Sequence, residues 1–253
     1  MRIKYAFSRP TSSEEERDQL FREYGMAGYD GLQLKAGQYA PYLHQPERFM
    51  EEWGHREGIG AALIAGGNVD EHGSKQLREL FRFGQRIGSE RIVFCHGVSR
   101  SKVTREDIRR FAEQLSELGI EAQQYGLKLS LHHHYDQPVM HREDFDIFFD
   151  GVQPGSVGLT VDTAHLVKSG IHDIAELIRA YASVIDNFHM KDFAAGEWQI
   201  LGRGEIDFGP IFQAILDTGY RGWISADEES GGEIAEGLTE CMSFLKQGLQ
   251  SMK

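Results

Sequence analysis

The sequence contains few cysteines and no long apolar run. Its 253 residues include only two cysteines, Cys95 and Cys241, and they form no Cys-x-x-Cys motif. A disulfide framework is therefore excluded, and such cysteine usage is typical of a reducing compartment. The least polar stretch, residues 58–67, is much shorter than the ~18 apolar residues that a membrane span needs. The first residues become polar too soon for a signal peptide, so we predict a cytoplasmic protein without membrane association.

Positive charge and glycine-rich nucleotide motifs are also scarce. Lysine and arginine number 27 against 39 aspartates and glutamates, which gives a formal net charge of −12. This balance argues against nucleic acid as the main partner, although it leaves room for a local basic pocket. No Gly-x-Gly-x-x-Gly motif follows the first apolar run, so a dinucleotide-binding sheet is not expected. The sequence shows no linker and no low-complexity segment, which favours a single domain over residues 1–253.

Short apolar runs alternate with amphipathic segments along the whole chain. Runs without polar alternation suit strands that are buried on both faces. Eight such runs in 253 residues give about 32 residues per strand–helix unit, which predicts a (β/α)8 TIM barrel of the α/β class; a doubly wound open sheet is the competing fold. The predicted strands are 3–7, 31–34, 60–65, 91–96, 128–132, 157–162, 185–190 and 222–227. The clearest predicted helices are 13–24, 104–125, 173–181, 208–218 and 232–249.

Four successive predicted strands end in a histidine or an aspartate. In a TIM barrel the C-terminal ends of the strands form the active-site face, so these side chains are expected to converge. Two imidazoles and two carboxylates suit one divalent Mn, Zn, Co or Fe ion. Any one of these histidines alone is more often structural, and the coincidence of all four carries the prediction. The predicted metal ligands are His132, Asp162, His189 and Asp227.

The last of these strands continues into Glu228 and Glu229. Because side chains alternate along a strand, Glu229 shares a face with Asp227 and could replace or assist it as a ligand. The same alternation turns Glu228 outward, where we expect it to be solvated.

Further polar residues are candidates for binding substrate or moving protons. A free imidazole titrates near neutral pH, so His165 and His134 are the predicted proton carriers, with Glu229 as a reserve base. The predicted substrate-binding residues are Lys191, Arg203, His96 and Gln33. Simpler readings stay open for three of them: His96 as a buried imidazole with a backbone partner, Gln33 as a satisfied core amide, and Arg203 as an exposed turn residue. Trp198 could form a wall against a sugar.

Several segments match a known family. They are Gly158-Leu-Thr-Val-Asp162-Thr-Ala-His165, His189-Met-Lys-Asp192, Gly202-Arg-Gly-Glu-Ile-Asp207 and Gly219-Tyr-Arg-Gly-Trp-Ile-Ser-Ala-Asp227, with Gly28-Tyr-Asp-Gly-Leu-Gln33 as the second strand. The chain resembles the xylose isomerase-like barrel superfamily of sugar phosphate isomerases and epimerases, which includes inosose dehydratases and isomerases. The resemblance covers essentially the whole chain and specifies the superfamily better than the substrate.

The resemblance implies one divalent metal held by Glu, Asp, His and Glu on the last four strands. By position these ligands fall on His132, Asp162, His189 and Asp227. His132 and Asp227 depart from the common pattern, because glutamate is usual at both places. In the family's epimerases the two glutamates act as paired acid and base. Their replacement here weighs against a simple two-base epimerase.

The predicted activity is that of a metal-dependent isomerase or epimerase acting on a sugar, keto-sugar or polyol, phosphorylated or not, through a metal-stabilised enediolate. One alternative is a dehydratase of an inosose-like keto-polyol, and another is a non-catalytic sugar-binding barrel. The superfamily also resembles endonucleases that cut DNA at abasic sites, but the acidic charge and the few metal-ligand residues in the second and third strands argue against that activity. The expected partner is a small sugar or polyol, and a homodimer stays an open alternative.

Overall fold

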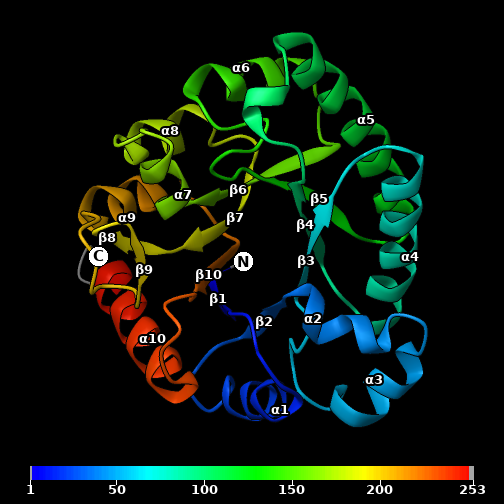
Figure 1. Cartoon of the computed structure of the whole chain (residues 1–253). Coiled ribbons are helices and arrows are strands. Elements are labelled where there is room, and N and C mark those ends of the chain that lie inside the picture. The colour runs from blue at the N-terminus through cyan, green and yellow to red at the C-terminus, as the bar shows by residue number, and fades with distance from the viewer. Residues whose placement is uncertain (1, 251–253) are drawn as a thin grey trace.

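The computed structural model describes residues 2–250, and within this range eight parallel strands close into a barrel. Their order around the barrel is β1-β10-β7-β6-β5-β4-β3-β2, with helices around the outside (Figure 1). The predicted (β/α)8 barrel is therefore confirmed. The barrel strands are β1 (Lys4–Ser8), β2 (Gly31–Leu34), β3 (Ala62–Gly67), β4 (Arg91–His96), β5 (Lys128–His132), β6 (Val157–Asp162), β7 (Ile185–Met190) and β10 (Trp223–Asp227).

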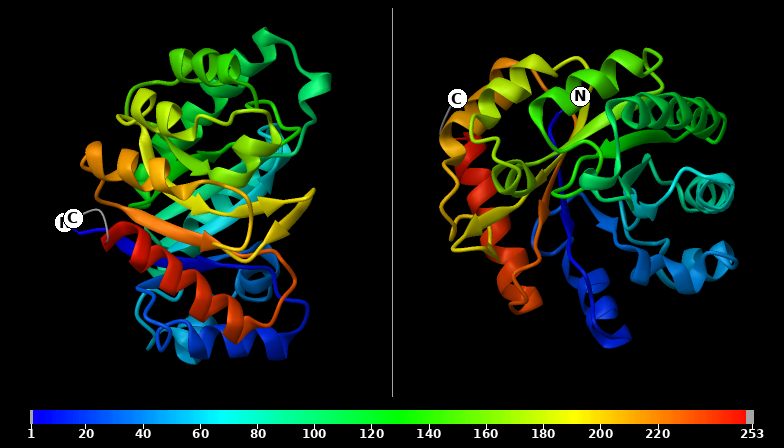
Figure 2. Two further views of the ribbon diagram at one scale, coloured as in Figure 1. Left: turned by 90° about the vertical axis from the view of Figure 1, so that its left-hand side faces the viewer. Right: turned by 45° about the horizontal axis from the view of Figure 1, so that its top comes forward.

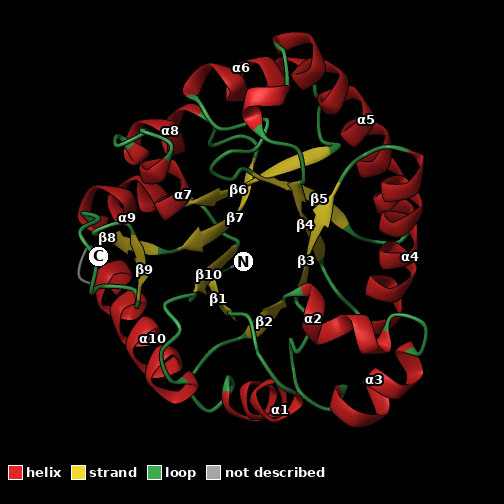
Figure 3. Ribbon diagram, in the orientation of Figure 1, coloured by secondary structure: helices red, strands yellow, loops and turns green. Residues whose placement is uncertain are grey.

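A ring of helices surrounds the strands (Figures 2 and 3). The helices predicted by capping signals begin where expected: Ser13 accepts a hydrogen bond from the Glu16 amide, and Thr104 and Asp107 form a capping box. The helices are α1 (Glu14–Glu23), α2 (Ala36–Tyr39), η1 (Ala40–Tyr42), α3 (Pro46–Trp53), α4 (Glu71–Ile87), η2 (Arg100–Lys102), α5 (Arg105–Gln124), α6 (Arg142–Gly151), α7 (Thr163–Lys168), α8 (Ile174–Ala180), α9 (Phe208–Asp217) and α10 (Ile234–Gln250). None of the helices within residues 2–250 combines the length and apolarity to cross a membrane.

A small hairpin interrupts the simple strand–helix alternation. Strands β8 (Asp192–Ala194) and β9 (Glu197–Gln199) pair antiparallel between β7 and α9, where the sequence analysis predicts only a loop. Ala195 and Gly196 form the turn, and both have positive φ angles, as a two-residue hairpin turn requires. The hairpin follows β7 directly, so it starts at the C-terminal face of the barrel.

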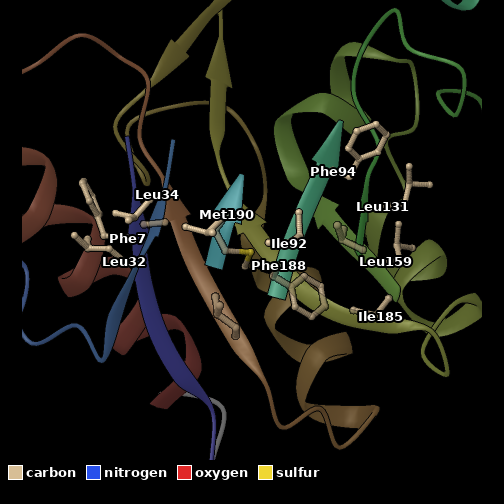
Figure 4. Close-up of a cluster of buried hydrophobic side chains, with 14 of the residues drawn as sticks. Phe7, Leu32, Leu34, Ile92, Phe94, Leu131, Leu159, Ile185, Phe188 and Met190 are labelled. Carbon is tan, nitrogen blue, oxygen red and sulfur yellow. The ribbon is translucent and has the colours of Figure 1, made fainter. Parts of the chain in front are cut away.

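The apolar core lies between the strands and the helices. Outward-facing side chains such as Phe7, Leu32, Phe94 and Phe188 are fully or almost fully buried in this layer (Figure 4). Because side chains alternate along a strand, their neighbours face the barrel axis. Several of these neighbours are polar and hydrogen-bonded to one another: Gln33, Ser130, Thr160 and Asn187. These residues form a polar layer inside the barrel beneath the C-terminal mouth, next to buried apolar side chains such as Val93.

Candidate active site

The ends of β5, β6, β7 and β10 bring the four predicted metal ligands together at the C-terminal mouth of the barrel. His132 Nε2 lies 3.3 Å from Asp162 Oδ2, and His189 Nδ1 lies 3.7 Å from Asp227 Oδ2. Parallel pairing of Asp162 with His189 places those two strand ends at the same height. Ligand atoms of Asp162, His189 and Asp227 all lie within 4.8 Å of one another, and a second triplet with the same spacing consists of His132, Asp162 and His165.

The first triplet has the chemistry of a cation site. His189 Nδ1 is buried and has no hydrogen-bond partner among the described residues, and it faces Asp227 Oδ2 across 3.7 Å. Buried polar atoms are nearly always satisfied, so a buried nitrogen whose lone pair is unused is unusual. Ligand atoms about 2.0–2.2 Å from a zinc-sized ion would stand at about this separation. Asp162, His189 and Asp227 therefore fit a small divalent cation.

Two lysines neutralise the carboxylates at and just after the end of β10. Lys35, just after β2, lies 2.8 Å from both Asp227 Oδ1 and Glu229 Oε1. Lys191, just after β7, lies 2.9 Å from Asp227 Oδ2 and 2.7 Å from Glu229 Oε2. Asp227 and Glu229 thus share one face, as predicted, but each carboxylate contacts two ammonium groups. Glu229 is therefore engaged in ion pairs and is poorly suited to act as a free base.

Burial and charge set the protonation states of the ligands. Burial by itself would raise the pKa of Asp162 and Asp227. His165 and then Lys191 outweigh it at Asp162, Lys191 and then Lys35 outweigh it at Asp227, and both pKa values lie well below the usual range. Burial lowers the pKa of His189 to about 3, so its imidazole is neutral. These are the protonation states that bind metal ions.

His132 and Lys191 carry positive charge in the metal-free site. Burial opposes the charge on His132, but Cys95 and Asp162 outweigh it and raise its pKa to about 10. Burial likewise opposes the charge on Lys191, yet Asp227, Asp162 and Glu229 together raise its pKa. His132 must therefore release a proton before it can bind a metal ion.

The two predicted proton carriers are stacked on each other. The ring centroids of His134 and His165 lie 3.6 Å apart, and burial lowers the pKa of both imidazoles. Trp198 of β9 packs its ring 5.0 Å from that of His165, and Lys191 Nζ lies 4.9 Å from the same indole ring. The β8–β9 hairpin therefore forms one wall of the site.

The four predicted substrate-binding residues separate into two groups. Lys191 lies in the mouth, and Gln33 lies beneath it, with its Oε1 2.9 Å from His189 Nε2. His96 instead faces the helices: its ring packs 4.5 Å from Phe111 of α5, and its Nδ1 accepts a hydrogen bond from the Val98 amide. This placement matches the alternative in which His96 is a buried imidazole with a backbone partner, and not a substrate-binding residue.

Arg203 also lies away from the ligands. Its guanidinium pairs with Glu236 and Glu240 of α10. The backbone amides of Gly202 and Gly204 do bind an anion, as the Gly-Arg-Gly pattern suggests, but that anion is the carboxylate of Asp192 in the same loop. A Cβ atom on Gly204 would stand 2.1 Å from Asp192 Oδ1, so glycine is required there.

Two residues of the mouth are not among the site residues predicted from the sequence. Lys35 lies two positions after Gln33, and Cys95 lies one before His96. Cys95 Sγ contacts His132 Nδ1 at 2.8 Å. Strand alternation could have found both, since Val93 and Cys95 share the inward face of β4 whereas His96 does not.

One prediction next to the site is wrong. Glu228 is only 2% exposed, whereas the acidic run predicts a solvated side chain. It faces away from the barrel axis as expected, but β1 is followed by Arg9, whose Nη1 lies 2.9 Å from Glu228 Oε2 in a buried ion pair. Ser230 completes the surroundings by donating to the same carboxylate. The partner lies more than two hundred residues away in sequence, which local patterning does not reveal.

Known proteins resemble this chain in both sequence and fold. The inosose dehydratase of Clostridium perfringens is 30% identical over 225 residues, which cover 81% of this chain and 70% of that protein. The crystal structure of the IolI protein with a bound zinc atom superposes with a TM-score of 0.80 at 20% identity and 98% coverage of both chains. An L-ribulose 3-epimerase structure gives a TM-score of 0.80 at 18% identity, covering 99% of this chain and 95% of that one.

The family assignment rests on almost the whole chain. A family model described as xylose isomerase-like TIM barrel matches residues 11–248, which include all the mouth residues described above. This match agrees with the resemblance based on the strand-end motifs. The protein therefore belongs to the xylose isomerase-like TIM barrel family.

Proposed function

We propose that this protein is a metal-dependent lyase that removes water from an uncharged cyclic keto-polyol of the inosose class. The observation that carries the proposal is the stacked pair of imidazoles, His134 and His165, beside a cation site. Elimination of water next to a ketone needs a base for the proton and an acid for the departing hydroxyl. A cation that holds the ketone oxygen makes that proton acidic enough to remove.

One residue, Tyr135, sets opposite tautomers in the two imidazoles. Its carbonyl oxygen lies 2.7 Å from His134 Nδ1 and can only accept, so His134 carries its proton on Nδ1. Its backbone N–H donates to His165 Nδ1 at 3.5 Å, so His165 carries its proton on Nε2. The free ring nitrogens therefore differ: His134 Nε2 is a base and His165 Nε2–H is an acid.

Asp162, His189 and Asp227 would hold the metal ion, and His132 would join them after losing its proton. A divalent cation bound there supplies a Lewis acid that stabilises negative charge on a ketone oxygen. The buried carboxylates and the neutral His189 provide the charge and lone pairs for this role. Lys191 lies next to the same carboxylates and would orient a substrate hydroxyl.

The imidazole pair then accounts for the loss of water. His134 Nε2 takes the proton from the carbon next to the ketone, and the C–H electron pair forms the new carbon–carbon double bond. The hydroxyl on the following carbon leaves with its bonding pair and takes the proton from His165 Nε2, which gives one water and leaves His165 as an imidazolate and His134 as an imidazolium. One proton then passes from His134 to His165, whose rings are in contact, which neutralises both side chains and restores both tautomers.

The charges around the mouth support an uncharged substrate. Lys35 and Lys191 are both paired with Asp227 and Glu229. Arg203 is paired with two glutamates of α10, and Arg9 with Glu228. A phosphate group would have to compete with Asp227 and Glu229 for Lys35 and Lys191, the two lysines next to the cation site. A neutral polyol needs no such exchange.

The relatives named inosose dehydratase support the same reaction. Isomerisation or epimerisation remains the second candidate, because the same base could remove a proton that then returns at another position. Two-base epimerisation is less well supported, since His132 replaces one expected glutamate and Glu229 is held by Lys35 and Lys191.

The experiment is incubation with a panel of inososes in deuterated water with Mn²⁺, followed by NMR and mass spectrometry. We expect a product that has lost one water. Deuterium uptake without loss of water would contradict the lyase and favour an isomerase or epimerase. Binding without either change would favour a non-catalytic sugar-binding barrel.

Variants of the imidazole pair test the mechanism. His134→Ala and His165→Ala should each retain the metal and lose turnover by about 10²–10⁴-fold, the usual contribution of a general acid or base. His172→Ala is the matched control, because that imidazole is exposed after α7. Full activity in His165→Ala would remove this residue from the mechanism.

A further inference from the structure

The side chain of Gln33 lies at the centre of the polar layer inside the barrel. It comes from β2 and is only 1% exposed, directly beneath the cation site. We infer that Gln33 is a positioning residue that fixes the tautomer of His189 and so presents Nδ1 to the metal. This inference rests on the metal site of the proposed function, and it assigns to Gln33 a role other than substrate binding.

Asn187 locks the orientation of the Gln33 amide. Gln33 Nε2 donates to Asn187 Oδ1 at 2.8 Å, and Asn187 Nδ2 donates back to Gln33 Oε1 at 3.1 Å. Asn187 Nδ2 also lies 3.3 Å from Thr160 Oγ1. Turning over one amide alone would break both hydrogen bonds of this pair, and the orientation of the pair as a whole is set by Thr160.

The pair is anchored further down the barrel. Thr160 Oγ1 lies 2.7 Å from Ser130 Oγ, which donates to Asp186 Oδ1 at 2.8 Å. Asp186 in turn pairs with the buried Arg91 at 3.2 Å. The hydrogen-bonded chain thus runs from an ion pair near the N-terminal end of the strands to the floor of the site. Because Ser130 donates its hydroxyl proton to Asp186, it accepts from Thr160, and Thr160 Oγ1 must then accept from Asn187 Nδ2. Turning both amides over would place Asn187 Oδ1 against this acceptor, so the orientation of Gln33 is fixed.

The fixed amide determines where His189 carries its proton. Gln33 Oε1 lies 2.9 Å from His189 Nε2. A carbonyl oxygen only accepts hydrogen bonds, so Nε2 must be the protonated nitrogen. The lone pair is left on Nδ1, the buried atom that faces Asp227 Oδ2 at 3.7 Å without a hydrogen bond.

Without Gln33, His189 has a competing tautomer. A proton on Nδ1 would point at the carboxylate of Asp227, 3.7 Å away, and would be attracted to its negative charge. That tautomer would occupy both a nitrogen and an oxygen ligand, and a metal ion would have to displace the proton. Loss of such an outer partner typically lowers metal affinity by about 10–100-fold.

The test is the tautomer of His189 in the metal-free protein, read from ¹⁵N shifts of the imidazole nitrogens. His189→Gln identifies the signals. In the wild type we expect a protonated Nε2 and an unprotonated Nδ1. Gln33→Met keeps the length but removes the acceptor, and should move the proton to Nδ1. Gln33→Glu restores an oxygen acceptor and should restore the wild-type tautomer.

Metal affinity gives the second readout, measured as competition with a chelator for Zn²⁺. Gln33→Met should bind about 10–100-fold more weakly than the wild type, and Gln33→Glu should recover most of the difference. If Gln33→Met does not fold, Gln33→Asn withdraws the acceptor by one methylene while keeping an amide in the barrel, and the same two changes are expected.

The outcomes separate this inference from the proposed function. A wild-type His189 protonated on Nδ1, or an unchanged tautomer in Gln33→Met and Gln33→Asn, would overturn the inference. An unchanged zinc affinity in both variants would overturn it as well. A wild type that has the expected tautomer but binds no metal would instead refute the metal site, while the positioning of His189 by Gln33 would stand.

Discussion

Glu228 and Glu229 are adjacent in the sequence, yet their carboxylates lie in different surroundings. Glu229 faces the mouth and pairs with Lys35 and Lys191. Glu228 faces away and forms a buried ion pair with Arg9. Removing one member of a buried pair leaves an uncompensated charge, which costs more than the pair itself contributes. The role of each glutamate is set by its partner, and not by its residue type.

At this scale we predict that Glu228→Ala destabilises the protein by about 3–5 kcal/mol, because Arg9 then keeps a buried, unpaired charge. Denaturant unfolding measures the change. Glu233→Ala removes an exposed glutamate from the same segment and should stay within about 0.5 kcal/mol of the wild type. Equal stabilities for the two variants would mean that the Arg9–Glu228 pair is not buried in solution.

The role of a single residue could be predicted only where the alternation of side chains along a strand shows which way the residue faces. His132, Asp162, His189 and Asp227 are strand-end residues that face inward, and the structure places them together. His96 ends its strand facing outward, so the strand end alone was a misleading signal. Arg203 and Glu228 could not be placed, because their partners come from distant parts of the chain.

At the scale of elements, β4 and α5 meet through a histidine. His96 is 9% exposed, its ring packs on Phe111, and its Nδ1 accepts the Val98 amide hydrogen. Burial lowers its pKa from 6.5 to about 4, and protonation of Nδ1 would also break the hydrogen bond. The contact between this strand and this helix therefore depends on a neutral imidazole.

This contact predicts an acid-sensitive part of the stability. Below pH 6.5 the unfolded chain binds a proton that folded His96 does not, so the free energy of unfolding falls as the pH decreases from 6.5 to 4. The full loss from this residue is on the order of 3 kcal/mol, at about 1.4 kcal/mol per pH unit. Above pH 6.5 the residue has no effect.

His96→Phe keeps the aromatic packing and removes the titration. Its stability should fall less than that of the wild type between pH 6.5 and 4, as measured by denaturant unfolding at several pH values. His172→Ala, which changes an exposed imidazole, should follow the wild-type curve. Parallel curves for His96→Phe and the wild type would contradict the account of this contact.

The elements themselves were largely predictable from the sequence. All eight barrel strands overlap the apolar runs, although β3 begins at Ala62 instead of Gly60, because residues 58–61 form a turn. Helices α4 and α6 are not among the clearest predicted helices, and the β8–β9 hairpin and the short helices α2, α3 and α7 were not predicted. The hairpin and the three short helices are too short for a periodic pattern to appear, and they form where tertiary contacts hold them, as Asp192 holds the loop after the hairpin.

At the scale of the whole molecule, the barrel brings together residues from position 33 to position 229. Its helices bury an apolar outer layer, and its interior is a hydrogen-bonded polar layer that ends at the mouth. Closure of the barrel could be predicted from strand count and spacing, and closure makes the strand ends converge. The pairing of Lys35 and Lys191 with Asp227 and Glu229 could not be predicted, since it depends on side-chain positions across the mouth.

The most direct test of the account is the metal content of the purified protein after dialysis, measured by elemental analysis. We predict about one divalent ion per chain in the wild type and in His172→Ala, and almost none in Asp162→Ala or His189→Ala, because each of the last two variants removes a ligand of the convergent site. Equal metal content in the wild type, Asp162→Ala and His189→Ala would contradict the central claim that these strand ends hold a cation.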